Sequence, residues 1–221
     1  MPAIPDVITI IGSSYYQPIA DLVDKLIAAA SRRQAGSESS HAENGYAAAC
    51  VVLLVALLES FTARVRFKRG TEIKGTPPVP DLIATLFPSC PTNGLLHEVF
   101  LLRNIVAHNH VWHLDVSQGT ENPKTLAEPR ALGFSVNKNY ESLVDVAALR
   151  TVTLNLSATP DRVGVSEVRA VFETVWLTLE HMNSVSFDHT PLAGRQVSFR
   201  GSRVAFESLG QALSAVGGSA A

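Results

Sequence analysis

The segment from about Tyr46 to Lys68 constrains the fold more than any other, because its first half is apolar on nearly every side. It contains the longest apolar run of the chain, Ala47 to Leu58. A helix that is apolar all round has to be covered on all sides by other elements. We therefore expect residues 46–69 to form the central helix of a bundle that ends near Gly70.

Two further segments have the helical spacing of a single apolar face, which predicts helices over 16–31 and 166–184. The loop between the first of these and the central helix is polar and rich in Gly and Ser, over residues 34–45. Shorter helices are expected over 81–87 and 95–110, the latter capped by Thr92 or Asn93. The residues of the two apolar faces are Ile19, Leu22, Val23, Leu26, Ile27 and Ala30, and Val168, Val171, Phe172, Val175, Trp176, Leu179 and Met182.

Apolar and polar residues alternate over 112–116 and 132–136, and TVTLNL at 151–156 has the same period of two, which is typical of strands. A polar loop, SQGTENPKTLAEP, separates the first two of these stretches. We expect a mainly α fold: one helical bundle domain over 1–187, with a small β-hairpin insertion at about 111–157. Residues 188–221 should form a C-terminal extension with a short helix at 203–213 and a frayed end.

Charge and cysteine usage limit the function. The formal net charge is −2, so any nucleic-acid binding must depend on local groups. Cys50 and Cys90 form no CxxC motif, which argues against a disulfide framework or zinc knuckle and favours a reducing cytoplasm. The apolar run is shorter than the roughly 20 residues that a bilayer requires, so we expect no membrane span.

The stretch LLRNIVAHNHVWHL, residues 101–114, places an arginine and three histidines among apolar residues. On a helical wheel, Arg103 lies within the apolar arc of helix 95–110. A guanidinium is costly there unless it is paired, and Glu59 lies similarly among the apolar residues of the central helix. We predict an Arg103–Glu59 contact; the alternative is that Arg103 extends its head group to water and Glu59 merely ends an apolar stripe.

A metal site would need His108, His110 and His113 to converge. On a helix, His108 and His110 point about 200° apart, and no HExxH motif or acidic cluster accompanies them. We therefore expect no metal or cofactor, although a helical metal-dependent hydrolase that uses these three histidines remains an alternative. A nucleophilic Cys50 or Cys90 is also open, but neither has basic neighbours, and buried structural cysteine is the commoner case.

Arg103 and His108 could instead act together on RNA. Arginine can hold a phosphodiester and stabilise charge that develops on it, and histidine can transfer a proton near neutral pH. His108 would remove the proton of a ribose 2′-hydroxyl, whose oxygen then attacks the adjacent phosphate. Such cleavage needs no metal and would spare DNA.

The sequence RNIVAH, residues 103–108, lies on a late helix of an α-helical domain and resembles the motif of the HEPN superfamily. The resemblance covers about residues 46–185. It implies a helical bundle and a metal-independent endoribonuclease, of the bacterial toxin–antitoxin or phage-defence kind. Arg103 and His108 match the family's catalytic pair, Asn104 matches its common polar position, and Glu59 lies where an acid often stands on the preceding long helix.

The resemblance further implies an RNA substrate, a homodimer in which two motifs face each other, and an antitoxin or activator protein as a partner. A non-catalytic HEPN module that binds RNA, nucleotide or only a protein partner is the alternative. In such a module Arg103 would have a structural role. A scaffold with none of these activities is also open.

Overall fold

The computed structural model describes residues 11–33, 40–70, 75, 77–107, 114–115, 122–123, 140–145, 147–185 and 195–217. The chain is mainly helical, as the sequence predicts. In order, the helices are η1 (Ile11–Tyr15), α1 (Tyr16–Ala30), α2 (His41–Arg69), α3 (Val79–Leu86), α4 (Leu96–Ala107), α5 (Tyr140–Leu143), η2 (Pro160–Arg162), α6 (Val165–Val185) and α7 (Ser208–Gly217). The strands are β1 (Leu114–Asp115), β2 (Asn122–Pro123), β3 (Val144–Asp145), β4 (Arg150–Thr151), β5 (Gln196–Phe199) and β6 (Ser202–Ala205).

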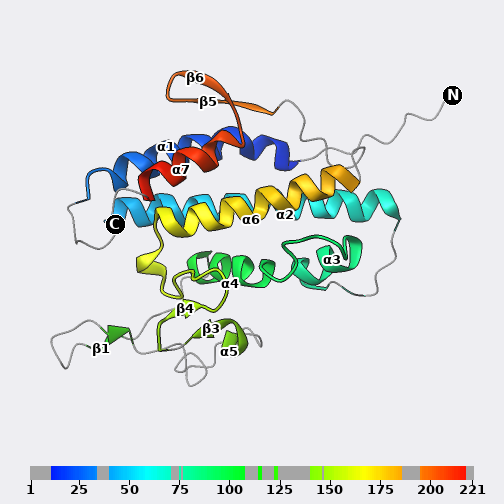
Figure 1. Cartoon of the computed structure of the whole chain (residues 1–221), viewed down its shortest axis with the longest axis horizontal. Coiled ribbons are helices and arrows are strands. Elements are labelled where there is room, and N and C mark those ends of the chain that lie inside the picture. Colours follow the sequence, from blue (N-terminus) through cyan, green and yellow to red (C-terminus); the bar gives the residue numbers. More distant parts are fainter. Residues whose placement is uncertain are drawn as a thin grey trace.

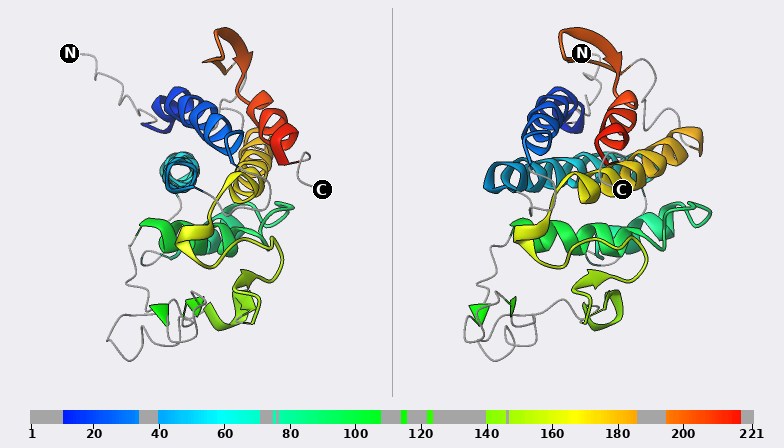
Figure 2. Two further views of the ribbon diagram at one scale, coloured as in Figure 1. Left: turned by 90° about the vertical axis from the view of Figure 1, so that its left-hand side faces the viewer. Right: turned by 60° about the vertical axis from the view of Figure 1, so that its left-hand side comes forward.

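The long apolar helix α2 is at the centre, which confirms its predicted place. It packs against α1, α4 and α6 (Figure 1). The left view of Figure 2 looks almost along its axis, with α1 on one side, α4 on the other and α6 beside it. By length and composition alone α2 could cross a membrane, but half of its most apolar stretch is buried among these helices, as in the core helix of a bundle.

Helix α2 begins at His41 and not at Tyr46, so the predicted polar loop over 34–45 is wrong in its second half. Ser40 caps the helix, because its hydroxyl accepts a hydrogen bond from the backbone N–H of Glu43 at 3.2 Å. Gly70 ends the helix in the left-handed conformation, with φ of 58°. Ser40 lies in a polar stretch whose composition is typical of a loop, which is why the sequence predicts a loop up to residue 45.

Two buried glutamates, Glu43 in α2 and Glu167 in α6, each form an ion pair with an arginine. Glu43, which is fully buried, is 3.5 Å from the guanidinium of Arg33, which follows α1. Glu167, in the first turn of α6, accepts the N–H of Gly164 at 2.9 Å and is 3.6 Å from Arg150. A Cβ on Gly164 would lie 2.9 Å from the Glu43 carboxylate, so a larger residue here would require the Glu43 side chain to shift.

Helix α4 is buried on two sides. Leu96, Val99 and Leu102 belong to the main core with α2 and α6. Leu101 and Ile105 point elsewhere and form a second, smaller cluster with Val144 and Ala158. This double burial explains why α4 is apolar on most of its surface.

A buried carboxylate holds the turn after β4 against α4. Glu98 is 1% exposed, and its two oxygens accept the backbone N–H groups of Thr153 at 2.8 Å and Leu154 at 2.7 Å. The strand predicted over 151–156 is therefore wrong except at Thr151, because Val152 to Leu154 form this turn. The alternation of TVTLNL reflects a turn bound to a carboxylate and not a strand.

The predicted β insertion after α4 is present as short antiparallel pairs, β1 with β2 and β3 with β4. Leu114 lies opposite Pro123 and Asp115 lies opposite Asn122. Strand β1 falls within the strand predicted over 112–116, whereas β2 falls within the predicted polar loop. The strand predicted over 132–136 lies outside the described residues. Strands β1, β3 and β4 lie below α4 in Figure 1.

The C-terminal segment differs from the short helix predicted at 203–213. Residues 202–205 pair with 196–199 as a hairpin, and the helix comes later, over Ser208–Gly217. The tight turn between the strands places both Arg200 (φ 50°) and Gly201 (φ 76°) in the left-handed region, as two-residue hairpin turns require. Side chains from this segment join the main core: Val197, Phe206, Leu209 and Leu213.

We expect Glu98→Ala to lower the free energy of unfolding by about 2–4 kcal/mol, because two charge-assisted bonds are lost and two backbone donors lose their acceptor. Glu98→Gln should recover part of this, since one carbonyl oxygen can still accept. Urea denaturation followed by circular dichroism measures the change in free energy. The rate of amide hydrogen exchange should increase most at Thr153 and Leu154. Glu180→Ala, at an exposed position on α6, is the control; an equal effect at both positions would contradict the role given to Glu98.

Candidate functional site

The structure brings together two of the four predicted site residues. The Nη2 of Arg103 on α4 donates to the Oε1 of Glu59 on α2 at 2.6 Å, which confirms the contact predicted from the helical wheel. The two helices bring these groups together because each carries a charge at the border of its apolar face. The guanidinium is thereby held against the bundle and does not project into bulk solvent.

The pair is only partly buried. The side chain of Arg103 is 25% exposed and that of Glu59 is 37% exposed. The guanidinium carbon of Arg103 lies 5.5 Å from the ring centre of Phe100, one turn earlier on α4, which adds a cation–π contact. The Nε atom of Arg103 is buried and has no hydrogen-bond partner among the described residues.

Asn104 follows Arg103 on α4 and is half-buried. His108 comes directly after Ala107, the last described residue of α4, and lies outside the described residues, as do His110 and His113. The geometry of the Arg103–His108 pair therefore stays a prediction. So does the alternative metal site of the three histidines; among the residues that the structure describes, no group of three metal-binding side chains occurs.

The two cysteines are buried. Burial raises the pKa of the Cys50 thiol to about 12, so it is protonated at neutral pH and a poor nucleophile. The Sγ of Cys90 is 3.2 Å from the hydroxyl of Thr92, which in turn lies 2.6 Å from that of Thr178 on α6. These contacts favour the structural interpretation of both cysteines.

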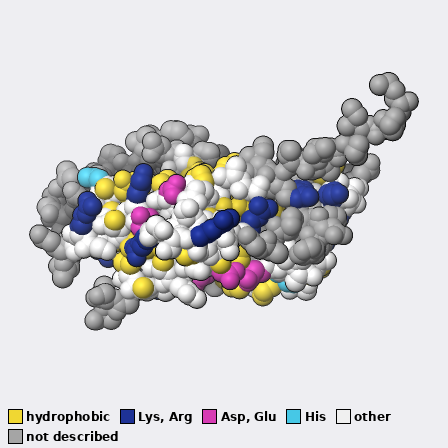
Figure 3. All heavy atoms as spheres, turned by 90° about the horizontal axis from the view of Figure 1, so that it is seen from above, with side chains coloured by type: hydrophobic (Ala, Val, Ile, Leu, Met, Phe, Trp, Pro, Cys, Tyr) yellow, Lys and Arg dark blue, Asp and Glu magenta, His cyan; other side chains and the backbone are white. Residues whose placement is uncertain are grey.

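Positive charge is dispersed over the face that carries α1 and the β5–β6 hairpin. Figure 3 shows Lys and Arg side chains spread along the length of this face, with hydrophobic and acidic side chains among them. One of the arginines, Arg200, is paired with Asp24 of α1 at 3.0 Å. Within the described part of this face no large uninterrupted basic surface is seen.

Sequence reasoning missed two features near the site. Glu98 fixes the 152–154 turn, and Phe100 packs against the Arg103 guanidinium. Both lie one or two turns before Arg103 on α4. An acidic residue inside an apolar helix was the available signal for Glu98, but its partners are backbone groups more than fifty residues away along the chain.

Comparisons of the chain with protein families, with curated proteins and with solved structures found no match.

We expect Glu59→Ala to lower the free energy of unfolding by about 1 kcal/mol, the upper range for a partly exposed ion pair. A double-mutant cycle with Arg103→Ala should give a coupling energy of about 0.5–1 kcal/mol, measured by urea denaturation. Glu180→Ala on α6 again provides an exposed acidic control. A loss of about 3–5 kcal/mol would indicate a fully buried pair, and a coupling energy of zero would mean that the contact contributes nothing.

Proposed function

We propose that this chain is a metal-independent endoribonuclease of the HEPN type that acts in the cytoplasm as a toxin or an antiviral-defence effector. The observation that supports the proposal best is the Arg103–Glu59 contact within a helical bundle. It places a partly exposed, oriented guanidinium on α4, five positions before His108. An arginine oriented by an acid on the long neighbouring helix is the arrangement that the RNIVAH resemblance implies.

In the proposed reaction, His108 takes the proton from a ribose 2′-hydroxyl and the 2′-oxygen attacks the adjacent phosphorus. The bond from phosphorus to the 5′-oxygen breaks, and the departing oxygen receives a proton. The products are a 2′,3′-cyclic phosphate and a 5′-hydroxyl end. Arg103 stabilises the charge on the phosphorane through its planar fork of donors, and no metal takes part.

Glu59 has a positioning role in this scheme. It binds Arg103 through Nη2 and so fixes the plane of the guanidinium. An arginine held in place loses less conformational freedom when it binds a phosphate, which favours catalysis. Asn104 supplies a further polar group next to the arginine.

A homodimer is part of the proposal. On one helix Arg103 and His108 point about 140° apart, so a second protomer that contributes the same residues would help to complete a phosphate site. Two arginines in one cleft would also raise the local positive charge of a chain whose net charge is −2. An antitoxin or activator protein is the further partner that a toxin or effector would need.

A second candidate function is a non-catalytic HEPN module that binds RNA, nucleotide or a protein partner. One observation favours it: the guanidinium of Arg103 already has a carboxylate partner and is about one quarter exposed. In this case Arg103 stabilises the α2–α4 packing. Substitutions of Arg103 would then lower the free energy of unfolding, and the protein would have no cleavage activity that they could affect.

We expect the purified protein to cleave RNA in the presence of EDTA, to leave 2′,3′-cyclic phosphate ends and to spare a substrate methylated at the scissile 2′-oxygen. His108→Ala should lower the rate roughly 10²–10⁴-fold, the usual effect of removing a positioned acid or base. Arg103→Ala should lose a comparable factor, and Arg103→Lys should recover little because an ammonium lacks the fork. A labelled oligonucleotide resolved on a denaturing gel measures these rates.

The matched controls are His110→Ala and His113→Ala, which should keep most of the activity. Loss of cleavage in EDTA, its restoration by zinc and a requirement for all three histidines would replace this proposal with a metal-dependent hydrolase. Binding of RNA without cleavage, unchanged in His108→Ala, would favour the non-catalytic module.

For the assembly we expect a symmetric dimer at micromolar concentration, measured by sedimentation. Mixing Arg103→Ala with His108→Ala protein should restore part of the cleavage if each cleft uses residues of both protomers. A monomer that cleaves RNA at the full rate would contradict the dimeric site while leaving the chemistry intact.

A further inference from the structure

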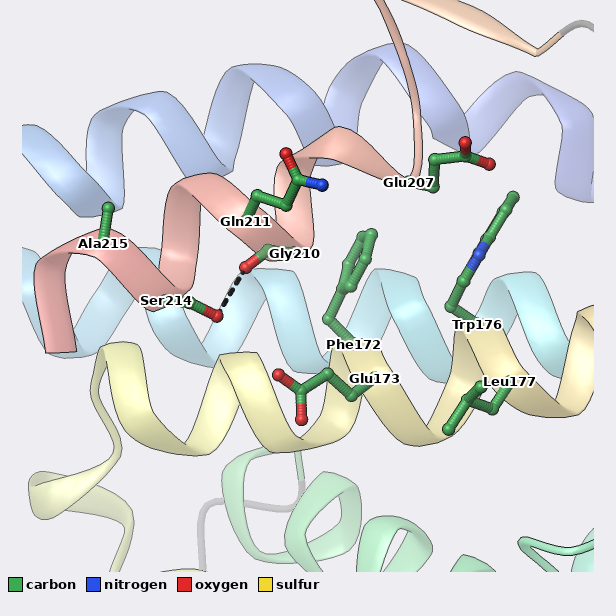
Figure 4. A pocket seen from close by; sticks show the side chains of 9 residues that line it. All are labelled: Phe172, Glu173, Trp176, Leu177, Glu207, Gly210, Gln211, Ser214 and Ala215. Atoms are coloured by element: carbon green, nitrogen blue, oxygen red, sulfur yellow. Dashed lines mark hydrogen bonds between the residues drawn. The ribbon is translucent and has the colours of Figure 1, made fainter. Parts of the chain in front are cut away.

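Helices α6 and α7 lie side by side and leave a groove between them (Figure 4). The groove is open to solvent and has a volume of about 690 Å³, within the range of sites that bind small molecules. It is separate from Arg103 and Glu59. The lining residues are Phe172, Glu173, Trp176, Leu177, Glu207, Gly210, Gln211, Ser214 and Ala215.

Aromatic and apolar side chains of α6 form much of this groove. Phe172 is 2% exposed and forms its floor, while Leu177 is 50% exposed at its edge. Trp176 is held by Phe206, with ring centres 5.7 Å apart. Gly210 of α7 has no side chain to fill the space, and a Cβ there would lie 3.2 Å from the Phe172 ring.

The charged groups of the groove are both acidic. Glu173 on α6 and Glu207, the residue before α7, extend to opposite sides of the Phe172 ring (Figure 4), and both are exposed. The hydroxyl of Ser214 is engaged by its own helix, since it donates to the carbonyl of Gly210 at 2.9 Å. Among the described residues that line the groove, none is Lys or Arg, so its charge is uniformly negative.

We propose that this groove binds a small organic cation, namely an ammonium or guanidinium group attached to an apolar body. The apolar body would lie above Phe172 and against Leu177, whose half-exposed hydrocarbon surface it removes from water. The cation would lie between a carboxylate and the face of Trp176, the best of the aromatic rings for a cation–π contact. An anion of the same shape would be repelled by Glu173 and Glu207, and a neutral analogue would lose both charge-based contacts.

The experiment uses 4-phenylbutylamine as the probe, with 4-phenylbutanol and 4-phenylbutanoate as its neutral and anionic analogues. The chain has two tryptophans, so Trp112→Phe leaves Trp176 as the fluorophore. We expect a saturable change in Trp176 emission with the amine, and at least tenfold weaker binding of the alcohol and the acid. Isothermal titration on the unaltered chain checks that Trp112→Phe has not created the site.

The double variant Glu173→Gln/Glu207→Gln should weaken amine binding at least tenfold. Glu180→Gln, on α6 but outside the groove, should leave it unchanged, and circular dichroism checks that every variant is folded. Equal binding of amine and alcohol, amine binding that survives the double variant, or no saturable change at millimolar amine would each overturn the proposal. So would a basic amphipathic peptide that binds this groove when the amine does not, because the partner would then be a polypeptide.

Discussion

The burial of α2 is the constraint from which the rest of the structure follows. Its buried side chains cover a wide arc of the helix: Val55, Leu57, Leu58 and Phe61 are among those with no exposed surface. One neighbouring helix cannot cover such a surface, so α1, α4 and α6 must all pack against it. The polar groups on α2 lie mostly toward its ends and at the borders between its neighbours, and the buried Thr62 donates its hydroxyl to the carbonyl of Leu58. Glu59 lies at such a border, where α4 presents Arg103.

A feature of this fold could be predicted from the sequence when the pattern that indicates it lies within one segment of the chain. The apolar periodicity of residues 16–30 and 165–185 determines α1 and α6, because spacing along one helix is enough to define its buried face. The Arg103–Glu59 contact was also predictable, since each residue is a charge next to an apolar arc and needs a partner. The mainly helical class follows from the same periodicity.

The remaining features depend on contacts between distant segments. Glu98 binds backbone groups at 153 and 154, and no side-chain pattern reports such a partner. The β5–β6 hairpin has four-residue strands and turns at Arg200–Gly201, where the usual signals are Asn-Gly or Asp-Gly. The α6–α7 groove likewise forms between distant segments, where Gly210 of α7 lies over Phe172 of α6. The predicted catalytic partner His108 follows the last described residue of α4, so its relation to Arg103 is still known from spacing alone.

The second, smaller cluster on α4 holds the chain segment that follows this helix. Val144 and Ala158 pack on Leu101 and Ile105, a face of α4 turned away from the main core. These contacts are therefore separate from the ones that cover α2. Substitutions at Val144 or Ala158 should weaken the attachment of this segment to α4 and leave the main core in place.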